Sequence, residues 1–136
     1  MLFRSGLASA LEEKETRSPA ETELMILAAQ VSRKCWEIAG TWLEIERAEY
    51  RLANTFLKAG NFDQAFVHAQ NCLQLIKDNN AGALEYFFAY EALALVEQAR
   101  KNSVGFSQAV ELAKEYFTKL SDNEKSWCEA TLKKLV

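Results

Sequence analysis

The sequence predicts an all-α protein made of antiparallel helical hairpins. Apolar residues recur at steps of three and four, no segment alternates with a period of two, and capping residues divide the chain into short stretches. One proline and five glycines in 136 residues are too few for a disordered tail, a collagen-like repeat or a turn-rich β-sandwich. A chain of this length buries enough surface to fold as one domain.

The first helix is predicted over residues 19–39. Ser18 is a good N-cap, Pro19 occupies the first helical position, and Glu21 completes a capping box. Gly40 is expected to end the helix by adopting a positive φ. Its apolar residues lie at the spacing of one helix face: Leu24, Leu27, Ala28, Val31, Cys35 and Ile38.

The next two helices are predicted over residues 42–59 and 62–77. Thr41 begins a second capping box, Gly60 closes the helix behind it, and Asn61 caps the following one. The apolar stripe of the later helix consists of Phe62, Ala65, Phe66, Ala69, Cys72, Leu73 and Ile76. Short connections favour antiparallel neighbours, so these helices are expected to form a hairpin.

Three further helices are predicted over residues 81–101, 106–120 and 122–135. The first is apolar on nearly every side, which predicts a central position with packing all round. A turn at residues 102–105 precedes the second, and a capping box at Ser121 opens the third. Residues 1–18 are expected to be a flexible or short helical segment before a single domain at 19–136.

Two segments of the chain match one another, and the first resembles the tetratricopeptide repeat family. Residues 60–69 recur in pattern at 104–113, with an aromatic residue after each turn and alanines where two helices would cross. The family-like spacing over residues 46–79 is Leu52-Ala53-x-x-Phe56-x-x-x-Gly60-x-Phe62-x-x-Ala65-x-x-x-Ala69-x-x-Cys72. The resemblance implies a right-handed superhelix of hairpins; the structural alternative is a plain antiparallel helical bundle.

The resemblance also implies a peptide-binding groove, because the family binds partners along the first helix of each hairpin. Carried over by spacing, the groove positions on helix 42–59 are Arg47, Tyr50, Asn54, Leu57 and Lys58. Tyr90 and Glu91 of the central helix are expected to line the same groove. The carboxylates Glu44, Glu46 and Glu49 are interpreted as a solvated, ion-paired helix face.

The sequence offers few side chains for catalysis or metal binding. His68 is the single histidine, no C-x-x-C pair joins the three cysteines, and no glycine-rich phosphate loop occurs. We therefore expect no enzyme activity, no cofactor and no metal. The unpaired cysteine pattern favours a reducing cytoplasm.

The charge pattern narrows the choice of partners. A net charge of −3 without a basic cluster disfavours nucleic acid, and no apolar run has the length to span a bilayer. The predicted function is a non-catalytic protein–protein interaction module with a protein or peptide partner. Two alternatives remain open: a small-ligand-binding or enzymatic helical bundle, and a homo-oligomeric protein that self-associates through Trp127 or its hydrophobic N-terminus.

Overall fold

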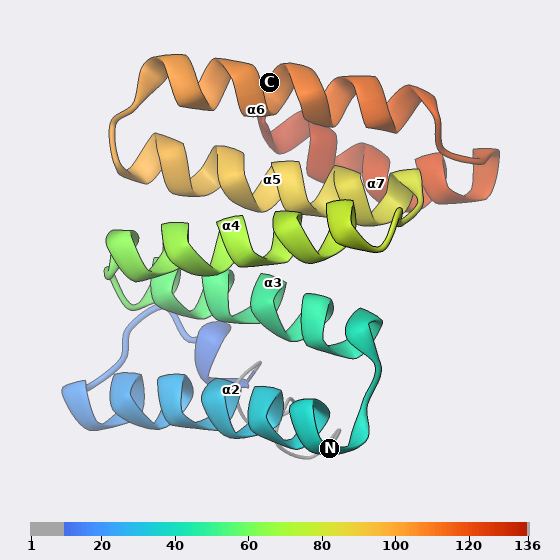
Figure 1. Ribbon diagram of the computed structural model, residues 1–136. Coiled ribbons are helices and arrows are strands. Elements are labelled where there is room, and N and C mark those ends of the chain that lie inside the picture. The colour runs from blue at the N-terminus through green and yellow to red at the C-terminus, as the bar shows by residue number, and fades with distance from the viewer. Residues whose placement is uncertain (1–9, 136) are drawn as a thin grey trace.

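The computed structural model describes residues 10–135, and this part of the chain is all-helical with no β-strand. The segment 10–12 is helical and leads into a turn. The longer helices are α2 (Pro19–Ala39), α3 (Trp42–Lys58), α4 (Phe62–Asp78), α5 (Ala83–Ala99), α6 (Ser103–Thr118) and α7 (Asp122–Leu135). Figure 1 shows them stacked largely in chain order, from α2 at one end to α6 and α7 at the other.

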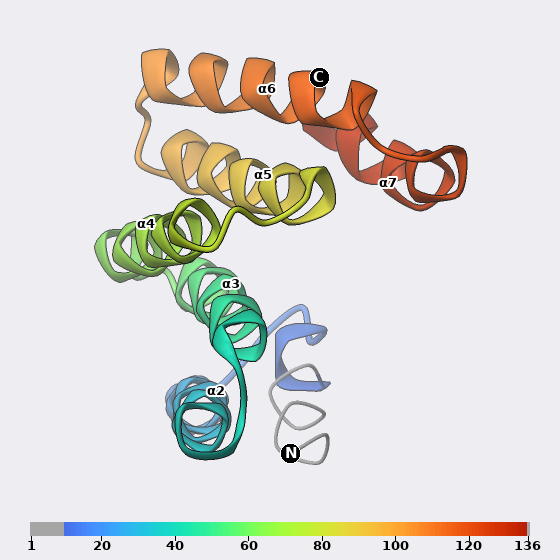
Figure 2. The same ribbon diagram turned by 45° about the vertical axis from the view of Figure 1, so that its right-hand side comes forward.

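Sequential hairpins account for most of the packing between helices. Each of the helices α2 to α6 packs against the next along the chain, and α7 packs against both α5 and α6. The odd-numbered α3 and α5 also contact each other directly. In Figure 2, residues 10–12 and α7 lie on the same side of this stack, flanking α3 and α5. None of the helices within residues 10–135 has both the length and the apolar character that a bilayer-spanning segment needs.

Local capping fixes where most helices begin. Each of the predicted boxes at Ser18 and Ser121 is present: the serine Oγ accepts the backbone N–H of the glutamate three residues later, at 3.1 and 3.3 Å. Those glutamates accept the serine N–H in return, at 3.1 and 3.0 Å. At Thr41 the backbone N–H donates to Glu44 at 3.3 Å. Because these bonds span three residues, local sequence is enough to predict them.

The predicted boundary before α6 is wrong by one helical turn. The helix begins at Ser103 rather than at Phe106, because the Asn102 side chain accepts the backbone N–H of Gly105 at 3.1 Å. Asn102 is thus an N-cap equivalent to Asn61, which accepts the N–H of Gln64. The central helix is also shorter than predicted, at Ala83–Ala99 instead of 81–101.

Among the described residues, α3, α4 and α5 are each followed by a turn that contains one left-handed residue, and these residues allow the turns to be compared in register. Gly60, Asn80 and Lys101 have φ values of 81°, 49° and 61°. After each, the next N–H bonds to the carbonyl five residues earlier, at 2.9, 3.1 and 2.9 Å, as in a Schellman motif. Lys101, rather than Val104, is therefore the structural counterpart of Gly60, so the predicted repeat is three residues out of register at this turn.

Gly40 ends α2 for a reason other than the predicted positive φ. Its φ is −103° and its ψ is −175°, an extended conformation open to any residue. A Cβ at this position would lie 2.8 Å from the Trp36 carbonyl oxygen and 2.9 Å from Trp36 Cε3. Close approach to the end of the helix, rather than backbone handedness, is what requires glycine here.

Two apolar clusters form the core and meet at α5. One joins α2, α3 and α4 around Leu52 and includes Val96 of α5. The other joins α4, α5, α6 and α7 around Phe87. The predicted seam alanines are all buried: Ala65, Ala69, Ala109 and Ala113. Since α5 contributes to both clusters, its predicted central position is confirmed.

The apolar face of α2 does not coincide with its buried face. The helix buries Met25, Ala28, Ala29 and Ser32 against its neighbours. Leu24, Leu27 and Ile38 are exposed, the last by 85%. Phe62, expected to close its hairpin, is also exposed. The spacing of apolar residues identified the stripe on α2, but it did not predict which of these residues face the core and which face solvent.

Candidate functional site

A cleft of about 310 Å³ opens between α3 and α5, and we call it the α3–α5 cleft. Residues one turn apart on each helix supply its walls, so side chains from both helices converge. Its lining residues are Glu46, Arg47 and Tyr50 of α3, with Leu84, Glu85 and Phe88 of α5. The cleft therefore combines apolar and aromatic walls with two carboxylates and one guanidinium.

Glu46 lies at the inner end of the α3–α5 cleft and is 2% exposed. The Cys72 thiol of α4 donates to its Oε1 at 3.0 Å, whereas its buried Oε2 has no hydrogen-bond partner within the part of the chain that the structure describes. Burial, together with the neighbouring Glu85 carboxylate, raises the pKa of Glu46 to about 8. The raised pKa means that Glu46 is largely protonated near neutral pH.

Arg47 closes the outer end of the cleft. Its Nε donates to Glu85 Oε1 at 2.9 Å, and its side chain remains 61% exposed. The hydrogen bond and the charge of Glu85 raise the pKa of Arg47 against the smaller effect of burial. Because Arg47 is largely solvent-exposed, this ion pair contributes little to stability and can rearrange when another charge approaches.

Tyr50 connects the cleft to a second buried carboxylate. Its hydroxyl donates to Glu91 Oε1 at 2.7 Å, and its ring meets Phe88 edge-on at 5.9 Å between centroids. Burial raises the pKa of Glu91, although the hydrogen bond from Tyr50 and the charge of Lys134 oppose the shift. Burial and the charge of Glu91 also raise the pKa of Tyr50, so the phenol stays protonated and acts as a donor.

Glu49 belongs to a separate polar cluster on another side of α3. Its carboxylate accepts Arg33 Nε at 2.6 Å and contacts His68 Nδ1 at 2.5 Å, while the His68 ring stacks on Phe56. Burial would raise the pKa of Glu49, but the bonds from His68 and Arg33 outweigh it and hold that pKa below its usual value. The expectation that Glu46 and Glu49 belong to a solvated face is wrong, since both are buried.

Four of the sequence-predicted groove residues come together around the cleft. Arg47 and Tyr50 line it, and Glu91 bonds to Tyr50. Asn54, half-buried one turn further along α3, also interacts with the Tyr50 hydroxyl. These residues form a continuous row across the seam between α3 and α5.

The other three predicted groove residues lie elsewhere. Leu57 packs against the cluster around Leu52, and the Lys58 side chain is exposed near the end of α3. Tyr90 is buried and stacks on Tyr116 of α6 at 5.8 Å between centroids. The family resemblance placed Leu57 and Lys58 in the groove by spacing, and Tyr90 was expected to line the same groove; in the structure Leu57 and Tyr90 pack into the core instead.

Sequence reasoning did not identify four lining residues of the cleft as groove residues. Leu84, Glu85 and Phe88 share one face of α5, at steps of one and three, and Glu46 lies one turn before Tyr50. Because α5 is apolar nearly all round, its sequence gave no sign of which face meets α3. The partnering of Glu46 with Cys72 likewise depends on how α4 packs.

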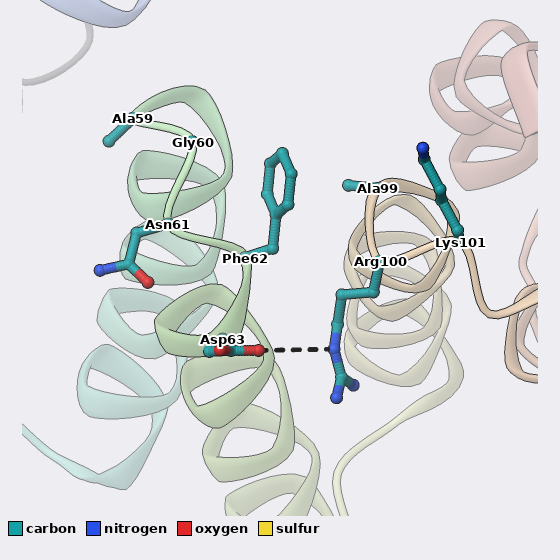
Figure 3. Close-up of a pocket in the computed structure, with 8 residues that line it drawn as sticks. All are labelled: Ala59, Gly60, Asn61, Phe62, Asp63, Ala99, Arg100 and Lys101. Atoms are coloured by element: carbon teal, nitrogen blue, oxygen red, sulfur yellow. Dashed lines mark ion pairs between the residues drawn. The ribbon is translucent and has the colours of Figure 1, made fainter.

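Another cleft, of about 660 Å³, lies between two helix-connecting turns (Figure 3). Asp63 and Arg100 approach across it, with 3.9 Å between Oδ1 and Nε. Arg100 also lies over the Phe66 ring, 4.1 Å from its centroid. None of its lining residues is buried, so it holds no desolvated charge that could select a ligand. The smaller α3–α5 cleft is the better candidate site.

The remaining chemical groups do not converge on one site. Tyr86 and Tyr90 stack with Tyr116, whereas His68 contacts Glu49. Tyr86, Tyr90 and His68 therefore do not line a common pocket. Among residues 10–135, no three His, Cys, Asp or Glu side chains are placed to hold one metal ion. Comparisons of the chain with protein-family models, curated proteins and solved structures give no significant match.

Proposed function

We propose that this chain is a non-catalytic protein-interaction module of the tetratricopeptide type, which binds a partner segment across α3 and α5. The observation that carries the proposal is the α3–α5 cleft, whose walls offer aromatic surface beside charged groups. Such a mixture suits an extended peptide, which needs apolar contact for affinity and polar contact for register. The sequential packing of hairpins supports the superhelical reading over a plain bundle.

The test is binding of peptides selected from a random dodecapeptide display library, measured by fluorescence anisotropy. The combined change Arg47→Ala and Asn54→Ala should weaken binding at least about tenfold, because it removes charged and polar contacts at the cleft. The melting temperature should change little, since Arg47 is exposed and Asn54 is only half-buried.

Lys58→Ala is the matched control, because Lys58 lies on the same helix but outside the cleft. Its effect on affinity should be within about twofold, as expected for an uninvolved surface residue. The proposal would be contradicted if no peptide selected from the library bound at the α3–α5 cleft. A large loss of melting temperature in the double variant would show that these residues stabilise the core instead.

The rival class, a small-ligand-binding or enzymatic bundle, draws support from the same buried carboxylates. Glu46 and Glu91 have raised pKa values, as ligand-binding and catalytic carboxylates often do. An interaction module accounts for Glu91 through its bond to Tyr50. A small molecule that binds the cleft and excludes every selected peptide would favour the rival.

A second candidate function, self-association, rests on the apolar stripe of α2, in which Leu24, Leu27 and Ile38 are exposed while Val31 and Cys35 are half-buried. Its members Leu24, Leu27, Val31, Cys35 and Ile38 follow steps of three, four, four and three, which read the same in both directions. A two-fold antiparallel pairing would set Leu24 against Ile38 and Val31 against its own copy, as an isologous interface requires. Trp127, the patch expected from sequence, is also exposed, while the predicted N-terminal patch lies largely outside the described residues.

Light scattering after size exclusion tests this second candidate. If α2 forms the interface, the protein should be dimeric and Ile38→Glu should convert it to a monomer, because a charge cannot be buried there unpaired. Val104→Glu, at an exposed aliphatic residue of α6, is the matched control and should leave the dimer intact. If the parent protein remains monomeric at a concentration of about 100 μM, self-association through α2 is contradicted.

A further inference from the structure

The α3–α5 cleft contains a buried acceptor that the fold leaves unused. Among residues 10–135, no group forms a hydrogen bond with Glu46 Oε2, and Glu46 is 2% exposed. Burying a polar atom without a partner is costly, and native structures keep such atoms rarely. Glu46 lines the cleft, so its carboxyl lies just behind the wall that an entering ligand would contact.

The surroundings of Glu46 select the chemistry of that ligand. The Glu85 carboxylate lies beside it and disfavours the ionised form of Glu46, so a second anion entering the cleft would be repelled by Glu85. Tyr50, Leu84 and Phe88 provide an aromatic and aliphatic wall. A cation on an aliphatic stem satisfies both features, since its head can pair with carboxylates while its stem packs against the rings.

We propose that the α3–α5 cleft receives a lysine or arginine side chain of the partner segment, with Glu46 and Glu85 as its anionic partners. This inference rests on the proposed interaction function and specifies the chemistry of the partner. The stem packs against Tyr50 and Phe88, and the head reaches the unused oxygen of Glu46. Arg47 keeps its bond to Glu85 at the outer end of the cleft, where its exposed side chain contacts a polar or acidic group of the same partner segment.

When the cation enters the cleft, it displaces the proton from Glu46. In the unbound protein the groups facing Glu46 are Cys72 of α4, Glu85 of α5 and Arg47 of its own helix. Burial and Glu85 favour the protonated form, whereas an inserted cation favours the carboxylate. One positive charge enters as one proton leaves, so the buried charge of the cleft does not change. Binding at neutral pH should therefore release protons to the buffer.

The experiment begins with dodecapeptides selected on the intact protein from a random display library. Selected peptides should share one Lys or Arg position. Replacing that Lys with norleucine, or that Arg with citrulline, should lower affinity at least about tenfold, because the carboxylates lose their charged partner. Calorimetry at pH 7 in phosphate and in Tris should give different binding heats, since the two buffers take up the released proton with different enthalpies.

Glu46→Gln is the decisive variant. The glutamine amide can still accept from Cys72 and can donate to Glu85, so the fold should be retained, as judged by its melting temperature. It should lower affinity for the basic peptide at least about tenfold and abolish the buffer dependence, because an amide carries no titrating proton. Glu85→Gln tests the second carboxylate without removing the Glu46 carboxyl. Glu111→Gln, at an exposed carboxylate of α6, is the matched control and should bind normally.

The outcomes separate this inference from the proposed function. Selected peptides that compete for the cleft but share no basic residue would overturn the inference and leave the interaction function standing. Unchanged binding by a folded Glu46→Gln protein would overturn it as well. If no peptide binds, the proposed function is wrong and this inference falls with it.

Discussion

Glu46 shows how far one side chain can depart from its local sequence pattern. It follows a glutamate two residues earlier and precedes an arginine, the signature of a solvated helix face. In the structure it is buried against Cys72 and Glu85, where desolvation favours the neutral carboxyl. Glu49 on the same helix is equally buried but stays ionised, because Arg33 and His68 bond to it. Partners, rather than burial alone, decide the charge of each carboxyl.

The raised pKa of Glu46 predicts that stability falls as pH rises. The folded protein holds a proton up to about pH 8, whereas the unfolded chain releases it near 4.5. The stabilisation is therefore full below about 4.5 and is lost progressively up to about 8. Urea denaturation across this range should show Glu46→Gln gaining stability relative to the parent as pH increases. A constant difference between the two proteins would show that Glu46 does not titrate in this range.

Glu49 predicts the opposite trend at acid pH. Its lowered folded pKa means that its ionised form stabilises the protein above the ordinary glutamate value of 4.5, and that this contribution is lost on acidification. Glu49→Gln should therefore cost most stability near neutral pH and progressively less below about 4.5. The same urea series measures this dependence, and a cost that grows on acidification would contradict the assignment.

At the scale of helices and turns, local sequence signals predicted most helix boundaries correctly and some of them wrongly. The boxes at Ser18 and Ser121 were predictable because donor and acceptor lie within one turn. Lys101 in a left-handed conformation was not predictable, because lysine has no local preference for it. The turn forms there because α5 and α6 must pair, and the tertiary contacts outweigh the strain.

Lys101→Gly should therefore stabilise the protein, by about 0.5–1 kcal/mol, since glycine adopts a positive φ without the Cβ penalty. Asn80→Gly is the matched comparison at an equivalent turn. Its gain should be smaller, because asparagine already tolerates the left-handed region. Chemical denaturation measures both, and a destabilising Lys101→Gly would show that its side chain makes contacts that outweigh the strain.

The seam between α3 and α4 should resist any increase in side-chain size. Ala65 is fully buried where the two helices meet, so Ala65→Leu should destabilise by roughly 1–3 kcal/mol through overpacking. Ala130→Leu on the exposed side of α7 is the control, with an expected change within about 0.5 kcal/mol. Equal stabilities of the two variants would place Ala65 at the surface.

At the scale of the whole molecule, α5 joins the two core clusters. It supplies Val96 to the cluster around Leu52 and carries Phe87 at the centre of the other. Neither cluster can lose its packing without exposing part of α5. The described chain should therefore unfold as one unit despite its elongated stack (Figure 1).

Hydrogen exchange tests this cooperativity. Buried amides of α3, near Leu52 and Ala53, and of α6, near Ala109 and Ala113, should open with free energies that agree within about 1 kcal/mol. Matching values follow if both regions exchange by global unfolding. Much faster exchange in α6 would show that the C-terminal cluster opens by itself, as separate units of a repeat array do.

The sequence alone determined the helical class, the order of the helices and several of their caps, because periodicity and capping bonds act within one or two turns. It also placed Arg47, Tyr50, Asn54 and Glu91 among the functional candidates, and the structure brings these together. Tertiary structure decided that Glu46 is buried, that Tyr90 packs against α6, and that Leu24, Leu27 and Ile38 of α2 are exposed. These outcomes depend on contacts between helices distant in the chain, and side-chain spacing within one helix carries no information about which neighbour will cover it.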